Sequence, residues 1–366
     1  MKISTTKEKL LNAVVLAERI AGKKESLQIL SCILLDVGKD ISVRATNLEA
    51  GIHVHVGGDV GERGIVAVPA NVLSQTLHSI NSDKINLKTD SNNLLVEARG
   101  TKTLIKSVPH EEFPTLTSVE GGKKGIIISR ERLIRGIQSV SYAASASMIR
   151  PELGSVFVSL QSGAIICVAT DSFRLAEKTI PGGAGKQDVE VLIPLKHATE
   201  LVYTLEHITG DEVNLYIDDS QIIVHADDVE YVSRVIEGNF PNYKEIIPKI
   251  VTSEITVLKS DFTETLRKAR VFSGNDQHIG LHVYPKRKIF TATAQSADVG
   301  EMSDLIDAAF SGEDVDINFH IGYLADCLSS ISSDSITFSF SGVGRPLVIR
   351  GVSDSSFMYL VMPLNR

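Results

Sequence analysis

The feature that most constrains this chain is a repeat about one third of its 366 residues long. The segment Val168–Ala176 has echoes around Thr46 upstream and, more faintly, around Thr293 downstream. The spacings between Thr46, Thr170 and Thr293 are 124 and 123 residues. A repeat of this length corresponds to a whole domain rather than to a solenoid unit. The sequence therefore predicts three copies of one domain.

The same order of elements is expected in each third: a strand, an amphipathic helix, further strands, a second helix and a last set of strands. The second helices follow Pro69, Pro194 and Ile321, and proline suits a helix start because its missing N–H has no partner there. Ser129 and the pair Ser260-Asp261 are the predicted N-terminal caps of two first helices. The first helices are marked by apolar residues at helical spacing, namely Leu10, Val14 and Ala17; Leu133, Ile137 and Val140; and Phe262, Leu266 and Ala269.

Alternating apolar residues and short polar turns predict antiparallel strands between these helices. The turns are Gly38–Asp40, Gln161–Gly163 and Pro285–Arg287. The expected fold class is therefore α+β, with two helices packed on antiparallel sheets in each domain. Glycine-rich and proline-bounded linkers place the domains at residues 1–125, 126–250 and 251–366. Edge strands are expected to pair across the joints and to give a continuous sheet with helices on one side.

Composition narrows the class of protein. Cys32, Cys167 and Cys327 are isolated among apolar residues, which predicts buried free thiols in a reducing compartment and neither disulfides nor a metal site. The N-terminus lacks the apolar stretch of a signal peptide, and no run of residues is long and apolar enough to cross a membrane. We expect a soluble cytoplasmic protein without a cofactor.

The charge is unevenly distributed. The first-helix segments 7–24, 126–150 and 259–270 carry +3, +3 and +2. Subtracting these eight positive charges from the net charge of −8 leaves −16 for the remainder. Solvated helix faces alone could account for one such segment, but three copies with the same sign favour a basic surface that meets phosphates without reading sequence.

Motifs for other chemistry are incomplete. Gly182–Lys186 resembles a phosphate-binding loop, but Gln187 replaces the required Ser or Thr, so a hairpin loop is expected. His53 and His55 share a strand face without a third ligand, which favours a solvated edge. Two alternatives to a DNA-associated protein stay open at this point: a hydrolase or nucleotide-binding enzyme on a repeated scaffold, and a scaffold that binds only proteins.

Over its whole length the chain resembles the bacterial DNA polymerase III beta subunits, the replicative sliding clamps. The central motif and the Met-Pro terminus are specific in combination. The segments that carry the resemblance are Met1–Ile3, Leu27–Leu30, Ala169–Ala176, Gly238–Tyr243, Ile246–Pro248 and Tyr359–Leu364.

This resemblance implies three tandem DNA-clamp domains and a head-to-tail homodimer that closes a ring around duplex DNA, independently of its sequence. The implied role is that of a non-catalytic processivity factor in DNA replication. Its implied partners are the DNA polymerase III alpha subunit, a clamp loader, and other polymerases or repair proteins. Because a ring retains DNA topologically, modest phosphate contacts would suffice and would permit sliding.

The resemblance also implies a pocket for a short hydrophobic peptide between the second and third domains. Without the resemblance, Phe173 and Leu175 would be compatible with ordinary buried side chains, and the C-terminus with a docked last strand. Met and Leu would supply adaptable apolar surface in the pocket, and Pro would limit the ordering cost. The implied lining is Leu153, Thr170, Ser172, Phe173, Arg174, Leu175, Pro241, Ile246, Pro346, Leu360, Met362, Pro363 and Leu364.

Basic residues in or near the helices are the expected DNA-facing set. The apolar pair Val271-Phe272 is the expected dimer contact, with a core position for one of the two as the alternative. The chain departs from the family at Lys244-Glu245 and at Pro151-Glu152, where some members carry basic and aromatic residues, so no DNA contact is carried over there. The expected DNA-facing residues are Lys7, Lys9, Lys24, Arg130, Arg132, Arg135, Arg150, Lys196, Arg267 and Lys268.

Overall fold

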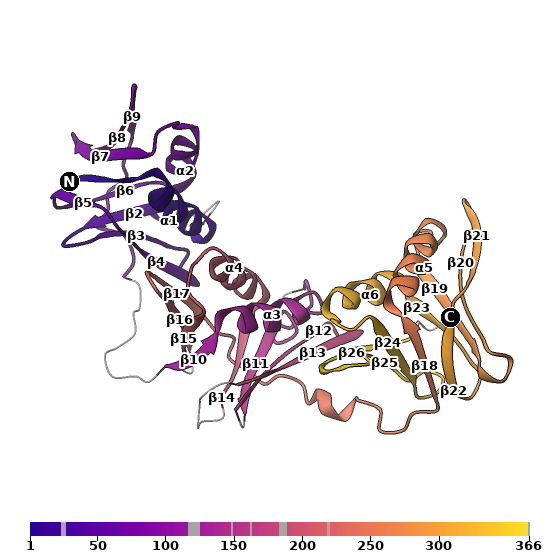
Figure 1. The fold of residues 1–366 in the computed structure, drawn as a ribbon. Coiled ribbons are helices and arrows are strands. Elements are labelled where there is room, and N and C mark those ends of the chain that lie inside the picture. Colours follow the sequence, from indigo (N-terminus) through magenta and orange to yellow (C-terminus); the bar gives the residue numbers. More distant parts are fainter. Residues whose placement is uncertain are drawn as a thin grey trace. The chain divides into compact units, whose positions relative to one another are not determined.

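The computed structural model describes residues 1–22, 27–115, 125–147, 149–161, 163–182, 189–217 and 220–364. These residues form two compact units whose boundary passes through the second repeat. The first unit comprises Met1–Ile134 and Lys196–Val235, and the second comprises Arg135–Leu195 and Ile236–Arg366. The three domains repeat one order of elements along the chain (Figure 1).

The first unit holds two antiparallel sheets. Its helices are α1 (Lys7–Ile20), α2 (Ala70–Ser79) and most of α4 (Leu195–Glu206). One sheet is ordered β5 (Asp59–Glu62), β1 (Lys2–Thr6), β7 (Lys84–Asp90), β8 (Asn93–Ala98) and β9 (Thr101–Ile105). The other is ordered β10 (Ile126–Ser129), β15 (Glu212–Ile217), β16 (Gln221–Ala226), β17 (Val229–Arg234), β4 (Ala50–Val56), β3 (Ile41–Thr46), β2 (Cys32–Val37) and β6 (Gly64–Pro69).

The second unit repeats this plan. Its helices are most of α3 (Arg130–Ser141), then α5 (Lys259–Phe272) and the short α6 (Ile321–Asp326). The larger sheet is ordered β14 (Val189–Pro194), β11 (Ser155–Gln161), β12 (Ala164–Thr170), β13 (Arg174–Pro181), β26 (Asp354–Val361), β25 (Leu347–Gly351), β24 (Ser335–Phe340), β18 (Ser253–Leu258) and β22 (Ala308–Gly312). The smaller is ordered β21 (Gly300–Leu305), β20 (Ile289–Ser296), β19 (His278–Tyr284) and β23 (Val315–His320).

Strand pairing across the joints is confirmed. The last strand of the second domain, β17, pairs with β4 of the first, and the last strand of the third domain, β26, pairs with β13 of the second. The expectation of one continuous sheet is wrong, because the described strands form four separate sheets. Each joint thus lies inside a sheet, where backbone hydrogen bonds hold neighbouring domains together.

The first helix of each domain is anchored in the same way. The backbone N–H groups of Lys7, Arg130 and Lys259 donate to the carbonyls of Asp83, Asp211 and Asp334, each over 2.8 Å. The side chains of the same three residues reach carbonyls that end the second helix or follow it, including those of Ile80, Leu205 and Ile331. A cation at that position satisfies carbonyls that the helix leaves unpaired. Three identical anchors confirm the repeat at the level of hydrogen bonds.

The apolar stripes of the three first helices are buried as predicted, and Ser129 accepts from the backbone N–H of Arg132. The predicted cap at Ser260-Asp261 is wrong, because α5 begins at Lys259 directly after Leu258 ends β18. α6 is shorter than expected and continues as a 3-10 turn over Cys327–Ser330.

The downstream echo at Thr293 is misplaced by three residues. Thr46 and Thr170 end β3 and β12, whereas Thr293 lies inside β20, which ends at Ser296. Ser296 pairs with Gly300 across its hairpin, as Thr170 pairs with Leu175 and Thr46 with Gly51. The structural spacing is therefore 126 residues from Thr170 to Ser296, because the third copy has diverged in this hairpin.

Candidate functional site at the domain joints

The two Thr-containing motifs form the same hairpin loop. Thr170 Oγ1 donates to the carbonyl of Arg174 and accepts from the N–H of Ser172. Asp171 Oδ1 accepts from the N–H groups of Phe173 and Arg174. Ser172 has φ of +78°, a left-handed conformation that the surrounding hydrogen bonds hold in place. The loop therefore presents Phe173 outward on a rigid support.

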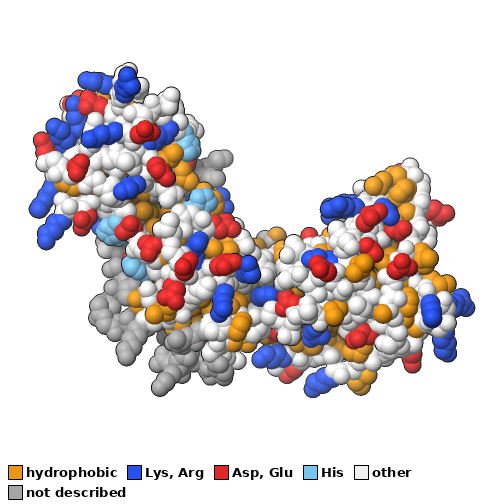
Figure 2. Space-filling view, viewed as in Figure 1, with side chains coloured by type: hydrophobic (Ala, Val, Ile, Leu, Met, Phe, Trp, Pro, Cys, Tyr) orange, Lys and Arg blue, Asp and Glu red, His pale blue; other side chains and the backbone are white. Residues whose placement is uncertain are grey.

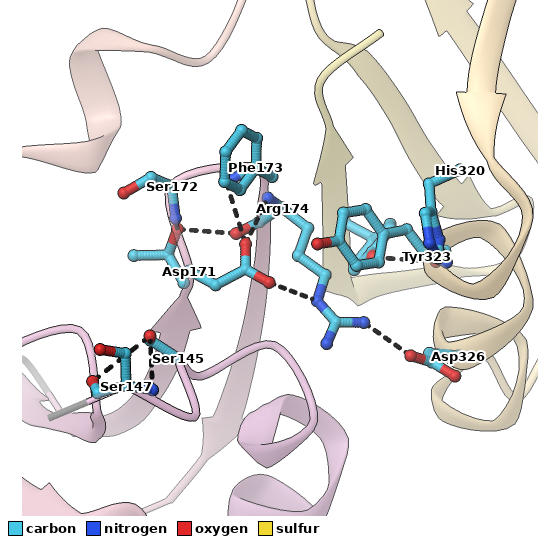
Figure 3. Close-up of polar contacts among 11 residues, drawn as sticks. Ser145, Ser147, Asp171, Ser172, Phe173, Arg174, His320, Tyr323 and Asp326 are labelled. Carbon is cyan, nitrogen blue, oxygen red and sulfur yellow. Dashed lines mark hydrogen bonds and ion pairs between the residues drawn. The ribbon is translucent and has the colours of Figure 1, made fainter. Parts of the chain in front are cut away.

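Arg174 links this loop to the third domain. Its Nε donates to Asp171 Oδ2 over 2.9 Å and its Nη1 donates to Asp326 Oδ2 over 2.6 Å (Figure 3). The guanidinium also lies over the rings of Tyr323 and Tyr142, at 4.4 and 5.8 Å from their centroids. These contacts satisfy a charge that is largely buried, so the joint has a defined geometry.

The C-terminal tail passes the same loop. The N–H of Met362 donates to the carbonyl of Phe173, and the N–H of Leu364 donates to the carbonyl of Asn318. Met362, Pro363 and Leu364 are each half-buried, and Phe173 is 61% exposed. The tail and the hairpin thus place apolar side chains together at the surface of the second unit, as a peptide-binding pocket requires.

Some of the expected lining lies beneath that surface. Leu175 and Leu360 are fully buried, in one cluster with Phe157 and Tyr243. They support the surface from below and expose no area to a ligand in this conformation. Leu153, Thr170 and Pro346 are also buried.

The segment after β17 contributes Pro241 and Ile246. Tyr243 of this segment donates its hydroxyl to Glu177 Oε2 over 2.6 Å, and burial, aided by that hydrogen bond, raises the pKa of Tyr243. Phe240 stacks on Phe157 with a centroid distance of 5.0 Å. Pro241 is half-buried, and Ile246 is exposed beside this anchor.

The structure adds residues that sequence reasoning missed. Asp171 and Asp326 hold Arg174, while His320 and Tyr323 stack with a centroid distance of 4.4 Å. Asp171 could have been identified, because an Asp side chain in a turn commonly accepts a hydrogen bond from the backbone N–H two residues further on. Asp326 carried no local signal, since it is 152 residues from Arg174.

The basic residues divide into two groups. Lys7 and Arg130 donate their side-chain N–H groups to carbonyls at or beyond the end of the second helix of their domains. Arg150 pairs with Glu152, and Lys268 pairs with Glu264 and Asp304. Lys24 lies outside the described residues. Lys196 has a longer ion pair, 3.8 Å, with Glu200. The other candidates, whose side chains are exposed, are Lys9, Arg132, Arg135 and Arg267.

Basic and acidic side chains are interspersed on the face drawn in Figure 2. The first-helix charge is lower than expected, because α1 ends at Ile20, before Lys23 and Lys24. Of the expected dimer contact, Val271 is 62% exposed, whereas Phe272 is half-buried.

The secondary features resolve as follows. All three cysteines are free and buried, as predicted. The His53–His55 strand is not a solvated edge, because β4 lies between β3 and β17. Burial, with the nearby Arg44 and His55, lowers the pKa of His53 to about 4. Of the expected hairpin loop at Gly182–Lys186, only Gly182 is described.

The described residues lack two further features. Among residues 1–22, 27–115, 125–147, 149–161, 163–182, 189–217 and 220–364, no group of three or more His, Cys, Asp or Glu could hold a metal ion. Within those same ranges, no helix has the length and apolar character needed to span a membrane.

Paired joints inside sheets and a repeated hairpin define a class of protein built from tandem copies of one domain. The three parts of the chain match models of the DNA polymerase III beta subunit: its N-terminal domain at residues 1–117, its central domain at 127–242 and its C-terminal domain at 244–365. The chain belongs to the DNA polymerase III beta subunit family, with three tandem beta-clamp domains. The chosen domain boundaries at 125/126 and 250/251 stay predictions.

Relatives resemble the chain over its full length. The beta sliding clamp of Pseudomonas aeruginosa is 26% identical over 374 residues, covering 100% of both chains. That of Streptococcus pneumoniae is 26% identical over 376 residues, covering 99% of this chain and 98% of the relative. The crystal structure of the DNA polymerase III beta subunit from Thermotoga maritima has a TM-score of 0.92 at 25% identity, covering 100% and 99%. The Bacillus subtilis sliding clamp, with a TM-score of 0.94 at 22% identity over 100% and 99%, supports the fold.

Proposed function

We propose that this chain is a DNA polymerase processivity factor, a homodimeric ring that encircles duplex DNA and tethers polymerases to it. Membership of the beta subunit family supports the role. The structural observation that carries the proposal is a strand pairing that joins neighbouring domains twice within the chain. The two strands that could form it a third time, β9 and β21, lie at sheet edges among the described residues.

The strand order supports ring closure. The third strand after the first helix is β4 in the first domain, β13 in the second and β21 in the third. In the first two domains this strand pairs with the last strand of the next domain. Among the described residues, β21 and the last strand of the first domain, β9, each end a sheet. Pairing β21 of one protomer with β9 of its partner would repeat the joint and give a head-to-tail contact.

The expected dimer contact agrees with this scheme. Val271 is the thirteenth residue counted from Lys259, the start of α5. Arg19 and Tyr142 are likewise the thirteenth residues counted from the starts of α1 and α3. Arg19 lies over Tyr203 of the second domain, and Tyr142 lies 6.1 Å from the ring of Tyr359 in the third domain. Val271, at the same place in the third domain, is 62% exposed. Its exposure supports a place for it, and for the adjoining Phe272, in the contact with a second protomer.

We assign DNA contacts to the exposed cations Lys9, Arg132, Arg135, Arg150, Lys196, Arg267 and Lys268. Carboxylates partly compensate the charges of Arg150, Lys196 and Lys268. Contacts of this kind neutralise phosphates without reading bases. Lys7 and Arg130 act mainly as helix anchors in this proposal.

The pocket formed by the Phe173 hairpin, the C-terminal tail and Ile246 would take a short apolar peptide. Its users would be the DNA polymerase III alpha subunit, a clamp loader, and other polymerases or repair proteins. The rigid loop around Ser172 favours affinity, because little ordering is needed on binding. The protein would act in the cytoplasm as a tether without catalytic activity, and a separate loader would open the ring.

Encirclement is tested by topology. After loader-driven assembly on nicked circular DNA, we expect the protein to stay bound at a salt concentration that removes simple phosphate binders. Linearising the circle should release it rapidly. Equal retention on circular and linear DNA would show that the protein binds without encircling, and the proposal would fail.

The pocket is tested separately. Removing residues 362–366 should abolish binding of a polymerase-derived peptide and leave the dimer intact. Phe173→Ala should weaken binding of the same peptide. Val352→Ala, which truncates another exposed apolar side chain of the second unit, should leave that binding unchanged. A monomer or an aggregate after truncation would mean that the tail is structural, contrary to the pocket assignment.

A further inference from the structure

The joint between the first and second domains repeats the backbone framework of the peptide-binding joint. Thr46 Oγ1 donates to the carbonyl of Ala50 and accepts from the N–H of Leu48. Asn47 Oδ1 accepts from the N–H groups of Glu49 and Ala50. Leu48 has φ of +73°, close to the +78° of Ser172. The hairpin is therefore the same as the one that carries Phe173.

Two further contacts match across the joints. The N–H of Arg234 donates to the carbonyl of Glu49, as that of Met362 donates to Phe173. The hydroxyl of Tyr231 donates to the carbonyl of His197 over 3.1 Å, as that of Tyr359 donates to the carbonyl of Tyr323 over 2.9 Å. The residue three positions after the accepting residue is Glu200 in one joint and Asp326 in the other. These two acids hold equivalent places.

The joints differ in the partner of that acid. Asp326 receives Nη1 of Arg174, but the residue equivalent to Arg174, four positions after the threonine, is Ala50. Glu200 is only 5% exposed, and its Oε2 has no hydrogen-bond partner. A buried carboxylate oxygen without a partner is costly. The first joint thus has the acid of the ion pair but no arginine at the position equivalent to Arg174.

The other oxygen of Glu200 is contacted by Lys196 at the edge of the buried region. Lys196 Nζ lies 3.8 Å from Oε1, beyond hydrogen-bond distance, although the Lys196 side chain is 71% exposed and so keeps most of its freedom. A second cation that acts on Glu200, Arg19, has its guanidinium over the Tyr203 ring, 4.8 Å from the centroid. An incoming arginine would therefore have to replace this long ion pair with Lys196.

Beside this acid, the hairpin offers an apolar contact and a second negative charge. Leu48 is 52% exposed at the tip of the hairpin. The Glu49 side chain is also exposed and makes only a long contact, 3.5 Å, with the exposed Arg234. The hairpin thus presents an apolar side chain, that of Leu48, next to carboxylates.

We infer that the joint between the first and second domains is a second docking site, which binds an exposed segment of a partner protein by placing an arginine on Glu200 and an aliphatic residue on Leu48. The arginine takes the role that Arg174 plays within the chain at the other joint. Arginine fits better than lysine because its planar fork can donate two hydrogen bonds to one carboxylate. The inference does not depend on DNA encirclement or on the Phe173 pocket.

The test uses the full-length protein with leucine methyl groups labelled for NMR. N-acetyl-leucyl-arginine amide is titrated against its citrulline counterpart, which has nearly the same shape and no charge. We expect the arginine compound to shift the Leu48 methyl signals and to bind at least about tenfold more tightly than the citrulline compound. Equal affinities, or shifts that bypass Leu48, would overturn the inference.

Variants locate the interaction. Glu200→Gln should remove the preference for arginine over citrulline. Ala50→Arg should block binding, because an internal guanidinium then reaches Glu200 as Arg174 reaches Asp326. Phe173→Ala should leave the titration unchanged, since it alters the other joint. If Arg19→Met strengthens binding severalfold, Arg19 occupies Glu200 in solution and the site is internal, which would also overturn the inference. The wild-type comparison of arginine with citrulline needs no variant to fold.

Discussion

Arg174 Nη1 and Asp326 Oδ2 lie 2.6 Å apart and join the hairpin of the second domain to the helix α6 of the third. The partners are 152 residues apart in the chain. Because Asp171 holds the same guanidinium from the hairpin side, the charge is fixed at both ends and the loop below Phe173 cannot rotate freely. We therefore regard this pair as the support of the proposed peptide pocket.

Replacing Arg174 tests that support. Arg174→Ala leaves Asp171 and Asp326 without their common partner, so we expect a loss of roughly 1–3 kcal/mol in the free energy of unfolding. Urea unfolding followed by circular dichroism measures it. Arg345→Ala removes an exposed arginine of the same unit and should change stability little. A similar loss in both variants would contradict a specific role for the ion pair.

Anchoring and DNA contact can be separated within α5. Lys259 donates its ammonium to the carbonyl of Ile331 over 2.7 Å, so Lys259→Met should cost about 1 kcal/mol of stability. Arg267 is exposed, so Arg267→Met should leave stability unchanged and lower the salt dependence of DNA binding by about one unit of slope. Thermal unfolding and fluorescence anisotropy at several salt concentrations give the two quantities. If Arg267→Met lowered stability and Lys259→Met lowered the salt dependence of DNA binding, the two roles would be reversed.

The buried Glu200 predicts a pH dependence. Burial raises the pKa of Glu200 from 4.5 to about 6, against smaller opposing effects of Lys196 and Arg19. The folded protein holds this proton more tightly than the unfolded chain, so its contribution to stability is present below pH 4.5 and is lost as pH rises through about 6. The loss is up to roughly 2 kcal/mol. Stability measured from pH 4.5 to 8 should fall less in Glu200→Gln, and parallel curves would refute the assignment.

The proposed protomer contact predicts a change of mass. Val271→Glu places a charge on an exposed apolar side chain that the dimer would bury, and burying an unpaired charge is strongly unfavourable. We expect the variant to elute with the mass of one chain in light scattering after gel filtration. Val352→Glu, at another exposed valine of the second unit, should leave the wild-type mass. A dimeric Val271→Glu protein would exclude Val271 from the contact.

The three cysteines should be chemically silent in the folded protein. Burial raises the pKa of Cys32 to about 11 and that of Cys167 to about 12, and it also raises that of Cys327. Because the thiolate is the reactive form, we expect no labelling by a thiol reagent at pH 8 until urea is added. A cysteine introduced by Val343→Cys, at a highly exposed position, should react at once. Comparable labelling of the native wild-type protein would show that the cores open.

Local sequence patterns were sufficient for the elements and their order. Apolar residues at helical spacing, such as Leu133 and Ile137, identify the helices, because one buried stripe is all that a helix on a sheet needs. The repeat of Thr46 in Thr170 identifies equivalent hairpins, because the same side chain makes the same hydrogen bonds in both. The equivalent hairpin of the third domain could not be identified in this way, because it lies at Ser296 and lacks the motif.

Within the candidate site, the sequence identified side chains but not their state. Phe173 and Leu175 are two residues apart in one motif, yet the first is exposed and the second is fully buried. Their difference depends on β26 pairing beside β13 and on the cluster that closes beneath Leu175. Similarly, Lys7 and Arg130 look like DNA-binding cations in the sequence, but distant carbonyls take up their donors.

The sequence by itself determined the α+β class, the threefold repeat and the membership of a clamp family, because periodicity and short hairpin motifs are local properties of the chain. Only the tertiary structure decided which acid faces a base. Asp326 pairs with Arg174, whereas Glu200 has only a long contact with Lys196, although both acids stand at the same place in their domains. Ion pairing depends on a few ångströms between residues that are far apart in sequence, and that distance exists only after the sheets have joined.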